Sequence, residues 1–336
     1  MIKKLPSVFF FLLVYATSAN AQQCKNLIFE GAGVRGIAYV GAIKYFEERR
    51  LLDTIQAVGG TSAGAITALA LSLGYTSAEL ERLIYETKLQ KFNDGRFFFM
   101  GGIARMNKRF GWYRGKAFLK WIENVIREKT GNAEISFREM HDRNFKDLYV
   151  TGTSLNHQKL LVFSWKTYPS MKVKDAVRIS MSIPLYFEAV IIDSLGHILK
   201  KADENYYDIT VDGGLTGNFP IAMFDSVFVD DTTQRIPNRQ TLGLRIDTPG
   251  QIEYDSLQAG LAPIPVTRSR HYVASFYNYV IENLNRGTLT REDWKRTISI
   301  SSGTIGPKIR KLSPEEKDLL INNGYRAAEV FFHNKL

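Results

Sequence analysis

The chain has 336 residues, of which 45% are hydrophobic and 23% are charged, and its formal net charge is +10. This composition is that of an ordinary globular protein and excludes a chain that is disordered over most of its length. The positive charge favours contact with anionic surfaces, and both nucleic acid and anionic phospholipid present such surfaces.

Residues 1–21 have the pattern of a secretory signal peptide. Lys3 and Lys4 precede an apolar run over residues 8–15, and the small-x-small sequence Ala19-Asn20-Ala21 follows it. The run is shorter than the ~20 residues that a membrane span requires. We therefore expect cleavage after Ala21 and export to a periplasm or out of the cell. No linker interrupts residues 22–336, so we expect them to form a single domain.

A glycine-rich motif follows the first predicted strand, residues 27–29, and leads into a helix over residues 37–50. It consists of Gly31, Ala32, Gly33, Val34, Arg35 and Gly36. The spacing Gly-x-Gly-x-x-Gly is found in dinucleotide-binding folds, but these also need an acidic residue about 20 residues later. Residues 60–62, Gly-Thr-Ser, occupy that position. We interpret the motif instead as a loop of backbone amides that stabilises an oxyanion, with Arg35 as a positive charge or an anchor of the loop.

The sequence Gly60-Thr61-Ser62-Ala63-Gly64 lies between a predicted strand, residues 55–58, and an apolar helix, residues 65–73. A serine on a tight turn from strand to helix needs small residues two positions before and after it, and Gly60 and Gly64 meet that need. This arrangement predicts Ser62 as a nucleophile at the end of the strand. The amino end of the following helix favours a developing negative charge.

The segment of residues 88–115 mixes basic and aromatic side chains, most densely over residues 96–114. Such a mixture is typical of a membrane interface, and its glycines suggest a mobile lid. A long loop whose phenylalanines pack on the core is an equal alternative.

An aspartate that could serve as the base follows a predicted strand, residues 209–211. Asp212 is followed by Gly213 and Gly214, which allow close approach of the backbone. The C-terminal part, residues 271–336, is expected to be helical, with a capping box at Ser313 and Glu316. Residues 251–270 are predicted to form a loop.

The histidines and the single cysteine, Cys24, show no metal-binding pattern. The five histidines are far apart in the chain: His141, His157, His197, His271 and His333. We expect neither a metal ion nor a cofactor, and an internal disulfide is excluded.

Taken together, the motifs resemble those of the patatin-like phospholipase family over about residues 26–228. The glycine-rich loop, the serine turn and Asp-Gly-Gly occur in the family's order, and residues 175–190, DAVRISMSIPLYFEAV, resemble the segment that precedes its aspartate. One departure is Ala32, where the family often has glycine, and its Cβ requires an ordinary φ. The resemblance implies a three-layer α/β/α fold with a mainly parallel central sheet.

The same resemblance implies the hydrolysis of carboxylic esters in phospholipids or other acyl lipids, with Ser62 as nucleophile and Asp212 as proton acceptor. Contact with a membrane surface would then be transient, and no nucleic acid would be involved. An unperturbed aspartate has a pKa near 3.9, so such a dyad would remain active on the acidic side of neutrality.

Two alternatives remain open from the residues. An α/β-hydrolase would complete a Ser-Asp-His triad with His271 or His333, although only one strand and one helix precede the serine turn, whereas that fold places several strands first. A catalytically inactive lipid-binding module would keep the fold without the chemistry.

Overall fold

The computed structural model describes residues 24–95, 98–202, 206–228, 234–268, 272, 275–276, 279, 282–283 and 285–334. The predicted signal peptide, His271 and the first residues of the basic segment, Arg96 and Phe97, lie outside the described residues.

A central sheet has the strand order β12-β11-β1-β2-β4-β8-β7, with β5 also paired to β4. Every pairing from β12 to β4 is parallel, whereas β5 and β8 are antiparallel to β4 and β7 is antiparallel to β8. The strands are β1 (Asn26–Phe29), β2 (Ala57–Gly60), β4 (Asp147–Ser154), β5 (Lys159–Phe163), β7 (Val190–Ile192), β8 (Asp208–Asp212), β11 (Thr241–Asp247) and β12 (Thr297–Ser301).

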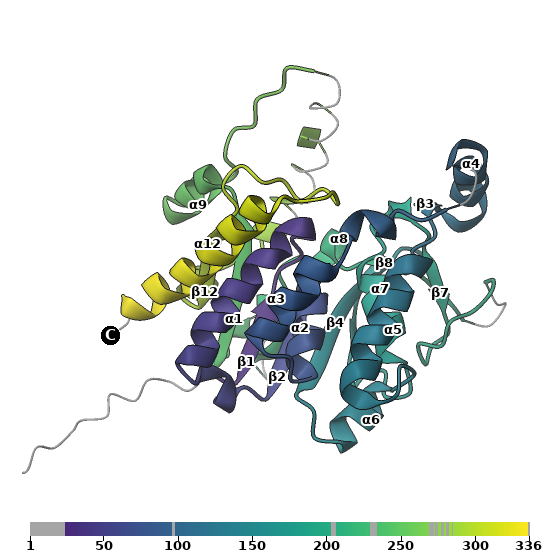
Figure 1. Cartoon of the computed structure of the whole chain (residues 1–336), viewed down its shortest axis with the longest axis horizontal. Coiled ribbons are helices and arrows are strands. Elements are labelled where there is room, and N and C mark those ends of the chain that lie inside the picture. Colours follow the sequence, from purple (N-terminus) through teal and green to yellow (C-terminus); the bar gives the residue numbers. More distant parts are fainter. Residues whose placement is uncertain are drawn as a thin grey trace, which may run out of the picture.

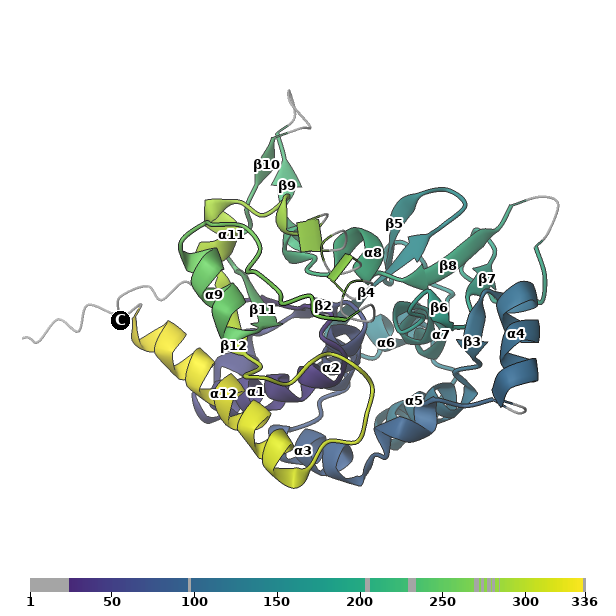
Figure 2. The same cartoon turned by 90° about the horizontal axis from the view of Figure 1, so that it is seen from above.

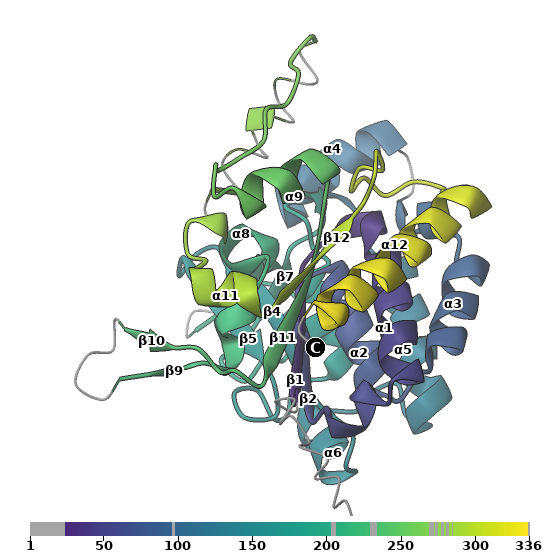
Figure 3. The same cartoon turned by 90° about the vertical axis from the view of Figure 1, so that its left-hand side faces the viewer.

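Helices cover both faces of this sheet, so the expected three-layer α/β/α fold with a mainly parallel sheet is confirmed (Figures 1 and 3). One layer contains α1 (Ala38–Glu48), α2 (Ala63–Ser72), α3 (Ser77–Glu86), α5 (Lys116–Thr130), α7 (Val173–Ser180) and α12 (Pro314–His333). Seen from above, α8 (Gly214–Gly217), α9 (Pro249–Ser256) and α11 (Arg291–Lys295) lie on the other side of the sheet (Figure 2).

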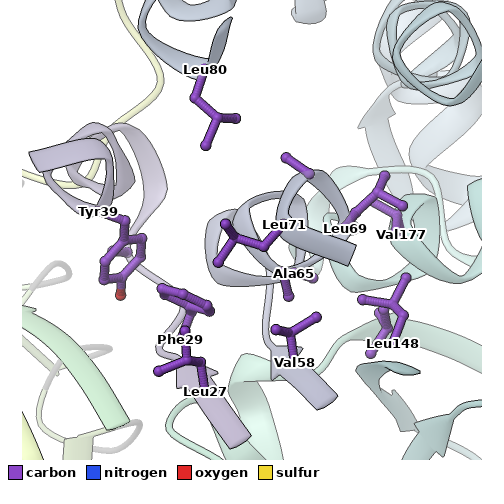
Figure 4. Close-up of a cluster of buried hydrophobic side chains, with 14 of the residues drawn as sticks. Leu27, Phe29, Tyr39, Val58, Ala65, Leu69, Leu71, Leu80, Leu148 and Val177 are labelled. Atoms are coloured by element: carbon purple, nitrogen blue, oxygen red, sulfur yellow. The ribbon is translucent and has the colours of Figure 1, made fainter. Parts of the chain in front are cut away.

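The alternation of side chains along β1 explains why both faces carry a core. Leu27 and Phe29 belong to the large core beneath the first layer of helices, which Figure 4 shows in part. Ile28 points to the opposite face and packs with Phe219 and Ile221 in a second, smaller core. The main core is therefore between the sheet and the helices of the first layer, and the second layer is thinner.

The basic segment is not a loop. It contains α4 (Phe98–Arg109) and β3 (Gly111–Tyr113), and β3 pairs in parallel with β6 (Leu185–Phe187). Within α4 the side chain of Arg105 is buried, and its Nε donates a hydrogen bond to the carbonyl oxygen of Trp112 at 2.7 Å. Exposed positions of the same helix include Ile103, Lys108 and Arg109.

The C-terminal half differs from the sequence prediction in two places. Residues 251–256 belong to α9 rather than to a loop, because the Thr248 side chain caps the helix by accepting from Gln251 N and Pro249 occupies the first turn. The part expected to be helical also contains β12, which extends the sheet beside β11. The remaining described elements are η1 (Gly33–Ile37), η2 (Leu51–Thr54), η3 (Leu89–Phe92), α6 (Phe137–Asp142), η4 (Ile221–Phe224), β9 (Ser226–Val227) and β10 (Arg235–Ile236).

Candidate active site

Ser62 lies on a sharp turn between β2 and α2, at the centre of the sheet. Its backbone has φ 53° and ψ −121°, a conformation that residues other than glycine rarely adopt. The turn also requires the two glycines. A Cβ on Gly64 would lie 2.3 Å from the carbonyl oxygen of Phe29, and one on Gly60 would lie 2.5 Å from the carbonyl carbon of Gly64. Sterically, this is a nucleophile elbow.

Two hydrogen bonds hold the elbow in place, one within the turn and one from a residue outside it. Gly64 N donates to the carbonyl oxygen of Thr61 at 2.8 Å, and Ser62 N donates to Oγ of Ser180 at 2.8 Å. Ser180 ends α7 within the segment of residues 175–190. Sequence reasoning quoted this segment but gave its serine no role.

Asp212 reaches Ser62 because of the strand register. Gly60, the last residue of β2, pairs with Val150 of β4, so Ser62 lies at about the level of Gly152. Asp212 ends β8, which runs in the opposite direction, and its partner on β4 is Gly152. The two predicted residues therefore meet across one strand although they are distant in the sequence.

Asp212 is almost completely buried, and its side chain accepts a hydrogen bond from Gly214 N at 2.7 Å. Oγ of Ser62 donates to Sδ of Met181 at 3.5 Å. Burial raises the pKa of Asp212 to about 7, and the interactions of its carboxylate with Gly214 N and with the Ser62 side chain lower it only in part. Arg35 is not among the causes of the shift, and its Nε donates to the carbonyl oxygen of Ala32 at 3.2 Å. The premise of an unperturbed pKa near 3.9 therefore does not hold for Asp212, and we expect activity to fall on the acidic side of neutrality.

Only part of the glycine-rich loop offers free amides. Gly31 N donates to the carbonyl oxygen of Asn218 at 3.0 Å, and Val34 N donates to that of Pro307 at 3.2 Å. Arg35 N donates to Ala32 O at 3.2 Å. Among the residues that the structure describes, the amides of Ala32 and Gly33 have no acceptor. These two are the candidate oxyanion donors.

The conformation of the loop depends on its residue types. Ala32 has φ −134°, which its Cβ tolerates. Gly33 has φ +55°, and a Cβ there would lie 2.0 Å from the carbonyl oxygen of Pro307. Asn218, to which the sequence analysis assigned no role, holds the loop a second time, because its Nδ2 donates to Gly31 O at 3.0 Å. The contact joins residues far apart in the sequence, so no local pattern announces it.

A cavity of about 720 Å³ contains the predicted residues that face one another. They are Gly31, Ala32, Gly33, Arg35, Ser62, Asp212 and Gly214. Its other walls are mostly apolar: Ile183, Pro184, Tyr186, Leu215, Ile264, Pro265, Pro307 and Ile309. Val34, Gly36, Gly60, Gly64 and Gly213 are not part of the lining. These five positions shape the surrounding turns.

The histidines in the described part of the chain lie away from this cavity. His141 and His157 each bond an aspartate through Nδ1 at 2.7 Å, namely Asp147 and Asp208. His333 ends α12 and is exposed. A search of the same residues for three or more of His, Cys, Asp and Glu arranged to hold a metal ion finds no such group.

Proteins with similar sequences occur in viruses and in a bacterium. The chain is 30% identical over 207 residues to protein R571 of Acanthamoeba polyphaga mimivirus, and the match covers 61% of this chain and 63% of that protein. It is 34% identical over 207 residues to YqhO of Bacillus subtilis, and this match covers 59% of this chain and 65% of YqhO. The probable lipid hydrolase 463L of Invertebrate iridescent virus 6 is 26% identical over 208 residues, with 62% and 65% covered. The match spans less than two thirds of each of these curated relatives.

Among solved structures, VipD from Legionella pneumophila is similar in fold, with a TM-score of 0.55 at 16% identity. The alignment covers 93% of this chain and 67% of that chain. A model of the patatin-like phospholipase family matches residues 27–225, from the start of β1 to just beyond η4, and this range includes the glycine-rich loop, the elbow and the Asp-Gly-Gly motif. The chain therefore belongs to the patatin-like phospholipase family.

Proposed function

We propose that this protein is a lipid acyl hydrolase that cleaves carboxylic esters through an acyl intermediate on Ser62, with Asp212 as proton acceptor. The observation that carries the proposal is that Ser62 and Asp212 lie together on the wall of one mostly apolar cavity, where the Ser62 side chain lowers the pKa of the Asp212 carboxyl group. A buried base with a pKa near 7 is suited to accept a proton at neutral pH.

In the first step, the Asp212 carboxylate takes the hydroxyl proton while Oγ of Ser62 attacks the ester carbonyl carbon. The carbonyl oxygen becomes an oxyanion, and the amides of Ala32 and Gly33, which have no acceptor among the described residues, are the backbone donors of the loop that can bind it. The intermediate collapses, and the departing alcohol takes the proton from Asp212. Water then repeats the sequence on the acyl-serine and releases the fatty acid.

The cavity favours a substrate with an acyl chain and an anionic head group. Its apolar walls suit a hydrocarbon chain, which gains by leaving water. Arg35 and Lys308 add two cationic side chains to the lining, and Glu282, an acidic lining residue besides Asp212, is paired with Arg286 at 3.0 Å. Phospholipid fits this combination.

The protein also needs access to lipid that is assembled in a membrane. We propose transient contact through α4, whose exposed Lys108 and Arg109 accompany the exposed apolar side chains of Ile103 and Phe110. Figure 1 shows α4 projecting from the body of the protein. No helix in the described part of the chain is long and apolar enough to span a membrane. With the predicted signal peptide, the site of action would be a periplasm or the exterior.

Labelling with a fluorophosphonate tests the chemistry directly. Wild type should be labelled on Ser62 and should hydrolyse a soluble ester, Ser62→Ala should do neither, and Asp212→Asn should react far more slowly. Wild type that is folded but neither reacts nor hydrolyses would favour the inactive lipid-binding module. A triad would instead require a histidine beside Asp212, and loss of turnover in His271→Ala or His333→Ala would favour the α/β-hydrolase alternative.

A further inference from the structure

Asn285 joins the two loops that carry the candidate reaction. Its side-chain Oδ1 accepts a hydrogen bond from Asn218 N at 2.5 Å, and its Nδ2 donates to the carbonyl oxygen of Gly214 at 3.1 Å. Asn218 holds Gly31 of the glycine-rich loop by two hydrogen bonds. Gly214 N donates to the carboxylate of Asp212. One buried amide thus contacts both the oxyanion side and the base side of the cavity.

The neighbouring residue, Arg286, fixes Asn285 to the body of the protein. Its guanidinium contacts Asp247 at 2.8 Å and Glu282 at 3.0 Å, and it also pairs with Asp255 of α9. Asp247 ends β11, Glu282 lies on the same segment as Arg286, and Asp255 lies on α9. The side chain of Arg286 is 10% exposed, so water weakens the ion pairs little.

The ion pairs continue to the residue that precedes the glycine-rich loop. Asp247 also contacts Nε of Arg245 at 3.0 Å, and Nη2 of Arg245 lies 3.0 Å from Oε1 of Glu30. Glu30 and Arg245 are almost completely buried. A chain of ion pairs therefore runs from Arg286 to Glu30. The hydrogen bonds of Asn285 and Asn218 connect the residue before Arg286 to Gly31, the residue after Glu30.

We propose that Asn285 and Arg286 are positioning residues, which hold the glycine-rich loop and the Asp212 turn at a fixed separation. The inference rests on the proposed ester hydrolysis and adds residues that lie beyond the range of the family match, residues 27–225. Displacements of about 1 Å between reacting groups can cost on the order of 10²-fold in rate.

The test compares Asn285→Ala with Asn283→Ala in the full-length chain. Asn283 is exposed, and within the described residues its Nδ2 bonds the carbonyl oxygen of Tyr279 in its own segment, so the control removes an amide two residues away. The readouts are kcat and KM on a soluble p-nitrophenyl ester, the rate of fluorophosphonate labelling, and the thermal midpoint. Asn285→Asp is a second variant that keeps the acceptor for Asn218 N and loses the donor to Gly214 O.

We expect kcat and labelling rate of Asn285→Ala to fall about 10- to 100-fold with little change in KM, because the reacting groups shift while the apolar walls remain. The pH midpoint of kcat should move upward, since the hydrogen bond from Gly214 lowers the pKa of Asp212. Asn283→Ala should behave as wild type, and Asn285→Asp should lie between the two.

Folded Asn285→Ala with the kcat, labelling rate and pH midpoint of Asn283→Ala would overturn the proposal. If Asn285→Ala does not fold, the test rests on Asn285→Asp. A kcat, labelling rate and pH midpoint equal to those of wild type in that variant would then overturn the proposed link to Gly214. Wild type without labelling or turnover rejects the proposed function itself, and this outcome is distinct from an active enzyme that does not depend on Asn285.

Discussion

The hydroxyl oxygen of Ser180 accepts a hydrogen bond from the backbone N–H of Ser62 at 2.8 Å. The bond connects the end of α7 to a residue with positive φ, and both serines are buried. The strained turn at the candidate nucleophile is therefore held from outside its own motif. Without this partner, the N–H would have no acceptor where water is excluded.

Ser180→Ala should lower both stability and turnover. An unsatisfied buried N–H costs about 1–3 kcal/mol, and relaxation of the elbow should reduce kcat about tenfold. Urea unfolding and ester hydrolysis measure the two effects. Ser72→Ala is the matched control, because Oγ of Ser72 is also buried and donates to Lys146 O at 2.5 Å, but at the far end of α2. Equal kcat in the two variants would contradict this role of Ser180.

The pH dependence of turnover should report Asp212. The carboxylate must be unprotonated to accept the serine proton, and its pKa of about 7 places the loss of that form near neutrality. We therefore expect kcat/KM for a soluble ester to fall about tenfold per pH unit below 7 and to level off above it. Activity that stays constant down to pH 5 would contradict the raised pKa.

The local motifs made much of the site predictable. Gly60, Ser62 and Gly64 lie within five consecutive residues, and the strand and helix around them follow from apolar patterns on each side. The strand before Asp212 was predicted over residues 209–211, and β8 is Asp208–Asp212. Such features depend on neighbours in the chain, and these are visible in the sequence.

The remaining features depend on partners that are far apart in the chain. Asn285 bonds Asn218 across 67 residues, and Ser180 bonds Ser62 across 118. The antiparallel direction of β8 is equally non-local, because it is set by pairing with β4. Arg105 belongs to a basic run, yet a charge pattern does not tell which member of a helix turns inward. In contrast, α9 carried a local signal, Thr248 followed by proline, that could have been used.

Replacement of the base should stabilise the fold above neutral pH. Asp212 has a pKa of about 7 in the folded protein and near 3.9 when unfolded, so between these values the folded chain binds more protons than the unfolded chain. The free energy of unfolding therefore falls as pH rises from about 4 to about 7. Asp212→Asn removes this loss, because the amide does not ionise.

At pH 8 we expect the Asp212→Asn variant to be more stable than wild type by up to about 4 kcal/mol, which follows from a shift of roughly three pKa units. The advantage should shrink as pH falls from 7 to 4. Urea unfolding of both proteins across this range provides the measurement. An advantage that is constant with pH would mean that packing, and not ionisation, is responsible.

Binding to anionic membranes should depend on the exposed basic residues of α4. Lys108 and Arg109 are exposed, whereas Arg105 is buried with its Nε bonded to Trp112 O, so only the first two can meet lipid head groups. Each basic side chain near an anionic surface contributes about 1 kcal/mol. The double variant Lys108→Gln, Arg109→Gln should therefore bind phosphatidylglycerol-containing vesicles up to roughly 30-fold more weakly at low salt.

The control for this variant is Arg49→Gln, Arg50→Gln, which removes the same charge at the C-terminal end of α1. Because α1 begins beside the carboxyl end of β1 and runs back along the sheet, its end lies away from the cavity. Co-sedimentation with vesicles gives the affinities, and hydrolysis of a soluble ester should be unchanged in both variants. Equal weakening by the two would mean that net charge alone governs binding. In that case α4 would have no special part in membrane contact, and high salt should abolish the affinity of every variant to the same extent.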